Sequence, residues 1–318
     1  MTPRASILAD WRKPLALAAA AAVVLCAIAP LVSDYGIHVL NTSLYYTILA
    51  ASWNLLAGFT GRFSLAHQAF AALGAYTSGL LAHYYDTPLW LGIPAGVLVA
   101  TLLGFALGRM VLRMRAIYLA IATWAFAETV HILLTAAYSI TRGELGLTVP
   151  PIFADLNPRS YFYLFVALTI ACVLAMYAIV RSPIGYFMRA IKDDELRAES
   201  LGVDTTRIKV FVFTVSSAFA GLAGAFYGHY VVVLSPQIAD FSEMAKLIVM
   251  VVVGGFGSFA GPLVGAAPIQ ILNAYLAKYG EWDMVIFAVV VIVFMRAHMG
   301  GLADLARLGW RRLRPIRP

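Results

Sequence analysis

Glu128 stands out chemically because it is a carboxyl group inside a long apolar run. His131 follows about one helical turn later, and Trp124 and Thr135 fall on the same face of a helix. A charge at the centre of a bilayer costs about 2.5–3.5 kcal/mol on insertion scales, so Glu128 must face protein or water, or be protonated. Two interpretations stay open, a residue of a transport path or gate and a hydrogen bond between packed helices.

The other reactive residue types form no catalytic or metal-binding pattern. His67 and His229 are each interpreted as a buried imidazole with its hydrogen bonds satisfied, because no metal-ligand spacing recurs, and Cys26 and Cys172 lie inside apolar runs. The sequence has no Gly-Lys pair and therefore no Walker loop, so any ATP must be bound by another chain. We predict no catalytic residue, no metal site and no cofactor bound by this chain.

A polar segment, residues 181–209, separates two apolar stretches and carries six basic and five acidic residues. Ser182-Pro183 is typical of a helix start, Gly202 of a helix end, and Asp204 of a cap on the helix that follows. The plainer interpretation is a solvated loop between membrane helices. Such a loop does not need two capped amphipathic turns, so we predict that the polar segment meets an aqueous partner.

Composition places the chain in a membrane, because 62% of its 318 residues are hydrophobic and 12% are charged. The net charge of +7 comes from residues that flank apolar runs, which excludes nucleic-acid binding as its explanation. We predict an all-α, polytopic membrane helix bundle that forms a single transmembrane domain over residues 1–318. The basic end, residues 298–318, is predicted to be a cytoplasmic tail that lies on the inner leaflet or is disordered.

Apolar periodicity predicts ten membrane spans. The first resembles a signal peptide, but its 18 residues and Pro30 favour a retained helix over cleavage. With both termini in the cytoplasm, 19 of the 23 basic residues fall on the cytoplasmic side, as the positive-inside rule expects. The predicted spans are 15–32, 37–58, 64–83, 89–109, 116–140, 161–180, 210–234, 243–258, 262–277 and 282–297.

Small residues recur four apart in two of these spans and predict close helix packing, because lipid gives helices no hydrophobic reason to associate. One stripe runs from Gly92 to Gly108 and the other from Ala220 to Gly228. Two glycine-rich turns, residues 58–62 and 254–258, are predicted at cytoplasmic helix ends, 196 residues apart, and hint at an internal duplication. They are either tight interhelical turns or the interrupted segments that line a transport path.

Three stretches resemble the inner-membrane permeases of branched-chain amino acid ABC importers, the LivM-type subunit and its LivH-type sibling. They are the run from Asn54 to Phe70 with Leu73 to Thr77, the run from Ile117 to Glu128 with Gly146 to Thr148, and the polar segment together with residues 220–225 and 254–258. The resemblance covers about residues 37–298. It implies a type II ABC importer fold, a second LivH-type permease, two ATPase subunits that use ATP and Mg²⁺, a periplasmic binding protein and an inner-membrane location.

The resemblance also assigns candidate residues. In the polar segment the positions that match the coupling motif are Arg189, Ala190, Ile191, Glu195, Ala198, Leu201 and Gly202. Candidates for the transport path or gate, chosen for polarity, are Gly58, Gly61, His67, Glu128, His131, Gly254, Gly255 and Gly257.

Three departures from the family pattern leave the substrate open among amino acids, carboxylates and amides: Arg62 for a usual Gln, Ala66 for a usual Gly, and His131 for a common Arg. The alternative function is a secondary transporter that couples Glu128 and His131 to protons, which leaves the polar segment unexplained. An intramembrane protease is poorly supported, because no His-Glu-x-x-His helix occurs and Ser258 lacks an evident dyad partner.

Overall fold

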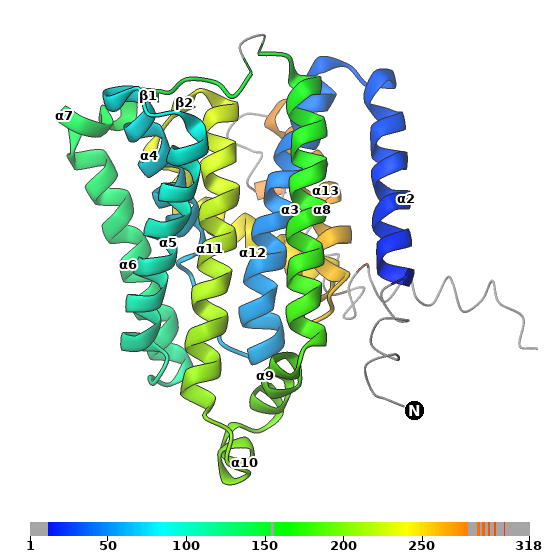
Figure 1. The fold of residues 1–318 in the computed structure, drawn as a ribbon, viewed down its shortest axis with the longest axis vertical. Coiled ribbons are helices and arrows are strands. Elements are labelled where there is room, and N and C mark those ends of the chain that lie inside the picture. Colours follow the sequence, from blue (N-terminus) through cyan, green and yellow to red (C-terminus); the bar gives the residue numbers. More distant parts are fainter. Residues whose placement is uncertain are drawn as a thin grey trace, which may run out of the picture.

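The computed structural model describes residues 12–153 and 156–278, together with residues 285, 286, 288, 289, 292, 296 and 302. Apart from those single positions, the predicted tenth span and the basic tail lie outside the described residues. Within the described part the chain is a bundle of long helices (Figure 1). The long helices are α2 (Arg12–Ile28), α3 (Asp34–Thr60), α4 (His67–Tyr85), α5 (Leu89–Val111), α6 (Ala116–Ala136), α8 (Pro158–Arg181), α11 (Thr205–Val231), α12 (Phe241–Gly255) and α13 (Gly261–Leu276).

These helices confirm the first nine predicted spans to within a few residues. By length and composition α5, α6, α8 and α11 are apolar enough to cross a membrane. The main difference is at α6, which ends at Ala136 because Ala137 leaves the helical region with ψ 46°. The chain then forms the short helix α7 (Tyr138–Thr141), and the Thr141 hydroxyl donates to the Leu134 carbonyl at 2.6 Å, which closes the turn.

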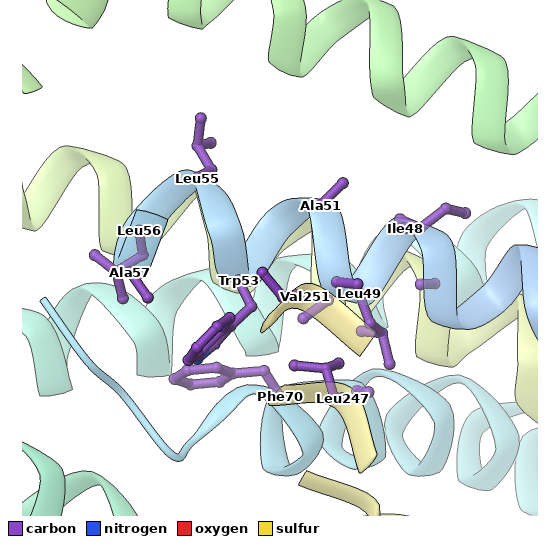
Figure 2. Close-up of a cluster of buried hydrophobic side chains, with 14 of the residues drawn as sticks. Ile48, Leu49, Ala51, Trp53, Leu55, Leu56, Ala57, Phe70, Leu247 and Val251 are labelled. Carbon is purple, nitrogen blue, oxygen red and sulfur yellow. The ribbon is translucent and has the colours of Figure 1, made fainter. Parts of the chain in front are cut away.

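Helix α3 lies at the centre of the bundle, in contact with α8, α11, α12 and α13. Nearly all of its side chains from Val39 onward are buried, whatever face of the helix they occupy. The second half of α3 contributes to the main hydrophobic core, where Trp53 lies beside Phe70 of α4 and Val251 of α12 (Figure 2). Because α3 is surrounded by protein, its Ser, Thr and Asn side chains are buried and find hydrogen-bond acceptors within the bundle.

Helices α4, α5 and α11 pack with their backbones in close contact, as the small-residue stripes predict. Every residue of the stripe from Gly92 to Gly108 is buried. A Cβ atom on Gly74 would lie 2.1 Å from the Gly221 carbonyl oxygen, and one on Gly224 would lie 2.0 Å from that of Ala71. Only glycine therefore fits where α4 crosses α11.

The two ends of the bundle carry different structures (Figure 1). At one end are α9 (Pro183–Asp193) and α10 (Glu195–Ser200), which belong to the polar segment. At the other end, β1 (Leu147–Thr148) pairs antiparallel with β2 (Val233–Leu234), with η2 (Gly143–Leu145) and η3 (Pro236–Ala239) nearby. At the edge of the bundle, next to α8, α2 continues into η1 (Ala29–Leu31) and packs against α8 (Figure 1).

Candidate functional site

The polar segment folds as two short helices separated by a sharp turn at Asp194. The Asp194 carboxylate caps α10 by accepting from the Arg197 amide at 3.0 Å, and Asp204 caps α11 by accepting from the Arg207 amide at 2.9 Å. Gly202 has φ +84°, the left-handed conformation predicted for it. Ser182 precedes α9 as expected, but its hydroxyl donates to the Ile179 carbonyl and caps nothing. The segment is thus a defined structure and not an extended loop.

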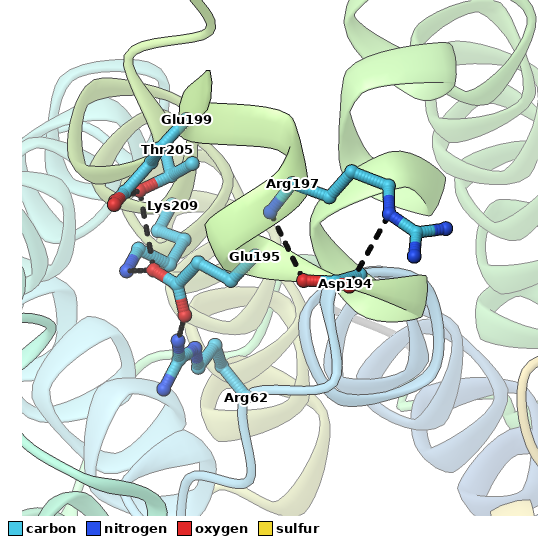
Figure 3. A network of polar contacts seen from close by, with 7 residues as sticks. All are labelled: Arg62, Asp194, Glu195, Arg197, Glu199, Thr205 and Lys209. Carbon is cyan, nitrogen blue, oxygen red and sulfur yellow. Dashed lines mark hydrogen bonds and ion pairs between the residues drawn. The ribbon is translucent and has the colours of Figure 1, made fainter. Parts of the chain in front are cut away.

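Glu195 fixes this structure to the bundle (Figure 3). Its two carboxylate oxygens form ion pairs with Arg62, from the α3–α4 connection, and with Lys209 of α11. The Lys209 side chain is 4% exposed and that of Arg62 is 15% exposed, so both charges are largely removed from water and are paired with this carboxylate. The Thr205 hydroxyl, 3.1 Å from Glu195 and 2.6 Å from Glu199, joins the same network.

Arg62 remains a cation in this setting. Burial lowers the pKa of its guanidinium and the Glu199 carboxylate raises it, but arginine stays protonated at neutral pH in any case. Arg62 therefore forms a charged link between the α3–α4 connection and α10.

The two glycine-rich turns, 196 residues apart in sequence, lie against one another and against α9. The Gly257 amide donates to Asn54 Oδ1 at 3.0 Å, and Asn54 Nδ2 donates to the Ser258 carbonyl at 2.9 Å. A Cβ on Gly58 would lie 3.0 Å from Gly257 Cα, so the close approach requires glycine. Lys192, at the end of α9, lies over the Phe256 ring at 5.5 Å. The structure thus brings together Gly58, Gly61, Gly254, Gly255 and Gly257 as a tight junction beneath the polar segment.

The candidate coupling residues divide by exposure. Ile191 and Ala198 are buried, 4% and 3% exposed, and with the ion-paired Glu195 they face the bundle. The members that face away from the bundle are Arg189, Ala190, Leu201 and Gly202. Leu201 is 81% exposed and its neighbour Leu196 is 77% exposed, which places two large apolar side chains on the outer surface of α10 and the turn after it.

Arg189 is exposed on the outer surface of α9, and its guanidinium also bonds the end of α8. Its guanidinium donates to the Gly185 and Val180 carbonyls at 3.1 Å and lies 5.2 Å from the centre of the Tyr186 ring. These bonds satisfy carbonyls where α8 meets α9 and hold the exposed Tyr186 ring in place.

Glu128 and His131 lie on the face of α6 that packs toward η3 and the start of α12. His131 Nδ1 is 3.1 Å from the Pro236 carbonyl, and Trp124 packs edge-on to Phe241. Glu128 is half-buried and has no hydrogen bond or ion pair with the described residues. The structure does not pair Glu128 with His131.

The buried histidines differ from one another. His229 bonds the Ser78 hydroxyl at 2.7 Å and the Pro150 carbonyl at 2.8 Å, as expected of a satisfied imidazole. His67 is fully buried at the start of α4 and packs edge-on to Phe70, but neither of its ring nitrogens has a hydrogen-bond partner among the described residues, so the prediction of a satisfied imidazole is wrong for His67. Among the described residues no three His, Cys, Asp or Glu side chains gather closely enough to hold a metal ion.

A second polar cluster, around Glu243 of α12, was not anticipated. Glu243 accepts a hydrogen bond from the Tyr46 hydroxyl and forms an ion pair with Lys246, one turn further along α12. Gln68 Nε2 donates to the Glu243 carbonyl at 3.2 Å, and the Tyr45 hydroxyl donates to Gln68 Oε1 at 3.4 Å. The spacing of Glu243 and Lys246, three residues apart at the start of an apolar span, was the available signal.

Comparisons with known proteins point to transport. Residues 36–295 match the family described as "Branched-chain amino acid transport system / permease component". The chain is 32% identical over 306 residues to the high-affinity branched-chain amino acid transport system permease protein LivM of Escherichia coli strain K12, covering 87% of this chain and 72% of that protein. It is 26% identical over 274 residues to LivH of the same strain, covering 79% and 88%. Ribose import permease protein RbsC of Haemophilus influenzae is 25% identical, covering 81% and 80%. No solved structure matches.

Proposed function

The chain belongs to the family of branched-chain amino acid transport system permease components, and from this premise we propose how it works as the LivM-type subunit of an ABC importer. It is a membrane-embedded transport subunit and not an enzyme. The solutes proposed are branched-chain amino acids, or related small amino acid, carboxylate or amide solutes, moved across the bacterial inner membrane. The relatives named LivM and LivH favour a second, LivH-type permease as its partner within the bilayer.

The further partners proposed are two cytoplasmic ATPase subunits, which bind ATP and Mg²⁺, and a periplasmic substrate-binding protein. Both termini are assigned to the cytoplasm because that orientation places 19 of the 23 basic residues inside. The polar segment then lies on the cytoplasmic side, and β1 and β2 on the periplasmic side.

One observation carries the proposal for the polar segment: it is exposed on its outer surface and bonded to the bundle on its inner surface. Leu196 and Leu201 present apolar area to a partner, while Glu195 joins the segment to both the α3–α4 connection and α11. A push by a partner on α9 and α10 therefore reaches α3 and α11 through ion pairs and packed side chains. Such a rigid link transmits movement better than a flexible loop does.

Co-purification in detergent with the ATPases encoded by neighbouring genes tests this function. Wild-type protein is expected to retain the ATPases, and the double variant Arg189→Glu, Gly202→Trp is expected to lose them while still purifying as a folded permease. The function proposed here is wrong if wild-type protein purifies without ATPases and transports alone on a pH gradient in proteoliposomes.

A further inference from the structure

A pocket of about 670 Å³ lies between the end of α5 and the start of α11, two helices that pack side by side (Figure 1). Its volume is within the range of about 300–1,000 Å³ that is typical of small-ligand sites. The pocket is at the end of the bundle that carries α9 and α10. In the orientation proposed above, this end is the cytoplasmic surface of the membrane, so the pocket lies at the level of the lipid head groups of the inner leaflet.

Three arginines line the pocket and leave it with a net positive charge. Arg109 is near the end of α5, Arg113 follows α5, and Arg207 is in the first turn of α11. All three residues are exposed, and none of their guanidinium groups forms an ion pair with the described residues. Asp204 also lines the pocket, where its carboxylate accepts from the Arg207 backbone amide as the cap of α11. The described lining residues therefore carry a net charge of +2.

An apolar stripe on α5 begins at the pocket and runs toward the middle of the membrane. Phe105, Leu102 and Leu98 are spaced three and four residues apart, so they share one face of α5, and all three side chains are exposed. The Arg109 guanidinium lies over the Phe105 ring, 5.8 Å from its centre, which holds the charge at the head of the stripe. Phe211 of α11 is also exposed and lines the pocket. A ligand that fits this surface has an anionic head and a long apolar part.

Other ligands use only part of this surface. A soluble phosphate compound has no apolar part to cover the stripe, and a cytoplasmic protein does not reach into the depth of the bilayer. A second permease reaches the stripe, but its own basic residues gather at the cytoplasmic side as well, so it brings like charge to the arginines. An anionic phospholipid supplies both parts, and basic pockets between membrane helices at the cytoplasmic side suit its head group.

We propose that this pocket binds an anionic phospholipid of the inner leaflet. The lipid phosphate accepts hydrogen bonds from the guanidinium groups of Arg113 and Arg207, whose planar forks match phosphate oxygens. One acyl chain covers Phe105, Leu102 and Leu98. A lipid bound in this way joins the end of α5 to the start of α11, directly after the polar segment. The site rests on the orientation proposed above and not on what the chain transports.

Native mass spectrometry of the purified full-length chain, titrated with phosphatidylglycerol or with phosphatidylcholine of the same acyl chains, tests the site. Each arginine near a membrane surface contributes about fivefold to the affinity for an anionic lipid. The double variant Arg113→Gln, Arg207→Gln is therefore expected to bind phosphatidylglycerol at least about tenfold more weakly and phosphatidylcholine as wild type does. The matched control is Arg115→Gln, Arg197→Gln, which removes the same charge from exposed positions at the same end of the bundle, outside the described lining of the pocket. It is expected to bind both lipids as wild type does.

Equal losses in the two double variants overturn the site, because overall charge then explains the binding. Equal affinity of wild-type protein for the two lipids also overturns it. Displacement of phosphatidylglycerol by inorganic phosphate, at constant ionic strength, assigns the pocket to a soluble phosphate compound and overturns the lipid. Unchanged lipid affinity in Arg113→Gln, Arg207→Gln with loss of co-purifying ATPases assigns the pocket to a protein contact instead.

A second variant decides if Arg113→Gln, Arg207→Gln does not fold. Thr206→Glu places a carboxylate on the wall of the pocket, in the first turn of α11, where a negative charge suits the helix. Weaker binding of phosphatidylglycerol to this variant supports the site, and unchanged binding overturns it. The measurement involves no transport, so wild-type protein that binds phosphatidylglycerol but retains no ATPases supports the site while the proposed importer function fails.

Discussion

Asn54 and Gly257 are joined by a hydrogen bond of 3.0 Å from the Gly257 amide to Asn54 Oδ1, although 203 residues separate them. A second bond, from Asn54 Nδ2 to the Ser258 carbonyl, holds the same turn. The two glycine-rich turns thus act as one junction between α3 and α12, directly beneath the polar segment.

Replacing Asn54 with Ala is expected to lower stability by about 1–3 kcal/mol, because the partly buried Gly257 amide and Ser258 carbonyl both lose their partner. The measurement is the thermal denaturation midpoint in detergent, followed by size-exclusion chromatography. Asn273→Ala, on α13, serves as control and is expected to change the midpoint little. Equal midpoints for the Asn54 and Asn273 variants would show that the hydrogen bonds of Asn54 do not stabilise the junction.

Glu195→Gln is expected to weaken the attachment of the polar segment to the bundle, because Lys209 and Arg62 lose their ion-pair partner and keep only the Glu199 carboxylate nearby. The cost is about 3 kcal/mol for a buried cation left without its partner. In proteoliposomes, the Glu195→Gln permease should stimulate the ATPases less than wild type does. Adding Lys209→Met should recover part of the loss, since the uncompensated buried charge is removed. A double variant no better than Glu195→Gln alone shows that the ion pair with Lys209 is not what matters.

Gly74→Ala is expected to prevent normal packing of α4 on α11. The new Cβ would lie 2.1 Å from a backbone oxygen, which cannot rotate away, and the yield of folded protein should drop sharply. Gly92→Ala is the matched control, because its Cβ would lie 3.1 Å from the Ser78 hydroxyl and needs only a small shift. Comparable yields for the two variants argue against backbone contact at Gly74.

Leu201→Ala together with Leu196→Ala is expected to reduce retention of the ATPases several-fold without changing the denaturation midpoint. Both side chains are more than three-quarters exposed, so the bundle does not depend on them. Leu145→Ala, equally exposed at the opposite end, should have no effect on retention. Retention that falls equally in both variants places the contact elsewhere.

Glu128→Gln is expected to leave uptake independent of the pH gradient. Glu128 makes no hydrogen bond or ion pair with His131 or with any other described residue, and His131 bonds the Pro236 carbonyl instead. Uptake of leucine should persist when a protonophore collapses the gradient and should stop when ATP is withdrawn. Loss of uptake with the protonophore at constant ATP supports the proton-coupled alternative.

Local sequence patterns predicted what depends on local spacing. The capped turns at Asp204 and Gly202 and the glycine stripe of α5 follow from residues within a few positions of one another, and the structure confirms them. Apolar runs of membrane-spanning length located nine of the helices, because each such run is recognisable from its own residues.

Local patterns could not predict which residues from distant parts of the sequence contact one another. Arg62 and Glu195 are 133 residues apart, and nothing near either residue indicates the partner. Glu243 forms an ion pair with Lys246 of the same helix, but its hydrogen bond from Tyr46, 197 residues earlier in the chain, has no signal in the sequence near either residue. Ser182 precedes α9 as the sequence predicted, but its hydroxyl bonds the Ile179 carbonyl of the preceding helix and does not cap α9.

The central position of α3 has a consequence for how the protein is made. Its neighbours α11, α12 and α13 lie 145 or more residues further along the chain, and the partner of Asn54 is at residue 257. At the usual pace of about 5–20 residues per second, the ribosome needs on the order of ten seconds to deliver them. During that interval α3, with its Asn and Ser side chains, lacks the helices α11, α12 and α13 that cover it in the finished bundle. An early helix is therefore among the last to gain its contacts, and the yield of this subunit depends on how the insertion machinery holds α3 until α11 arrives.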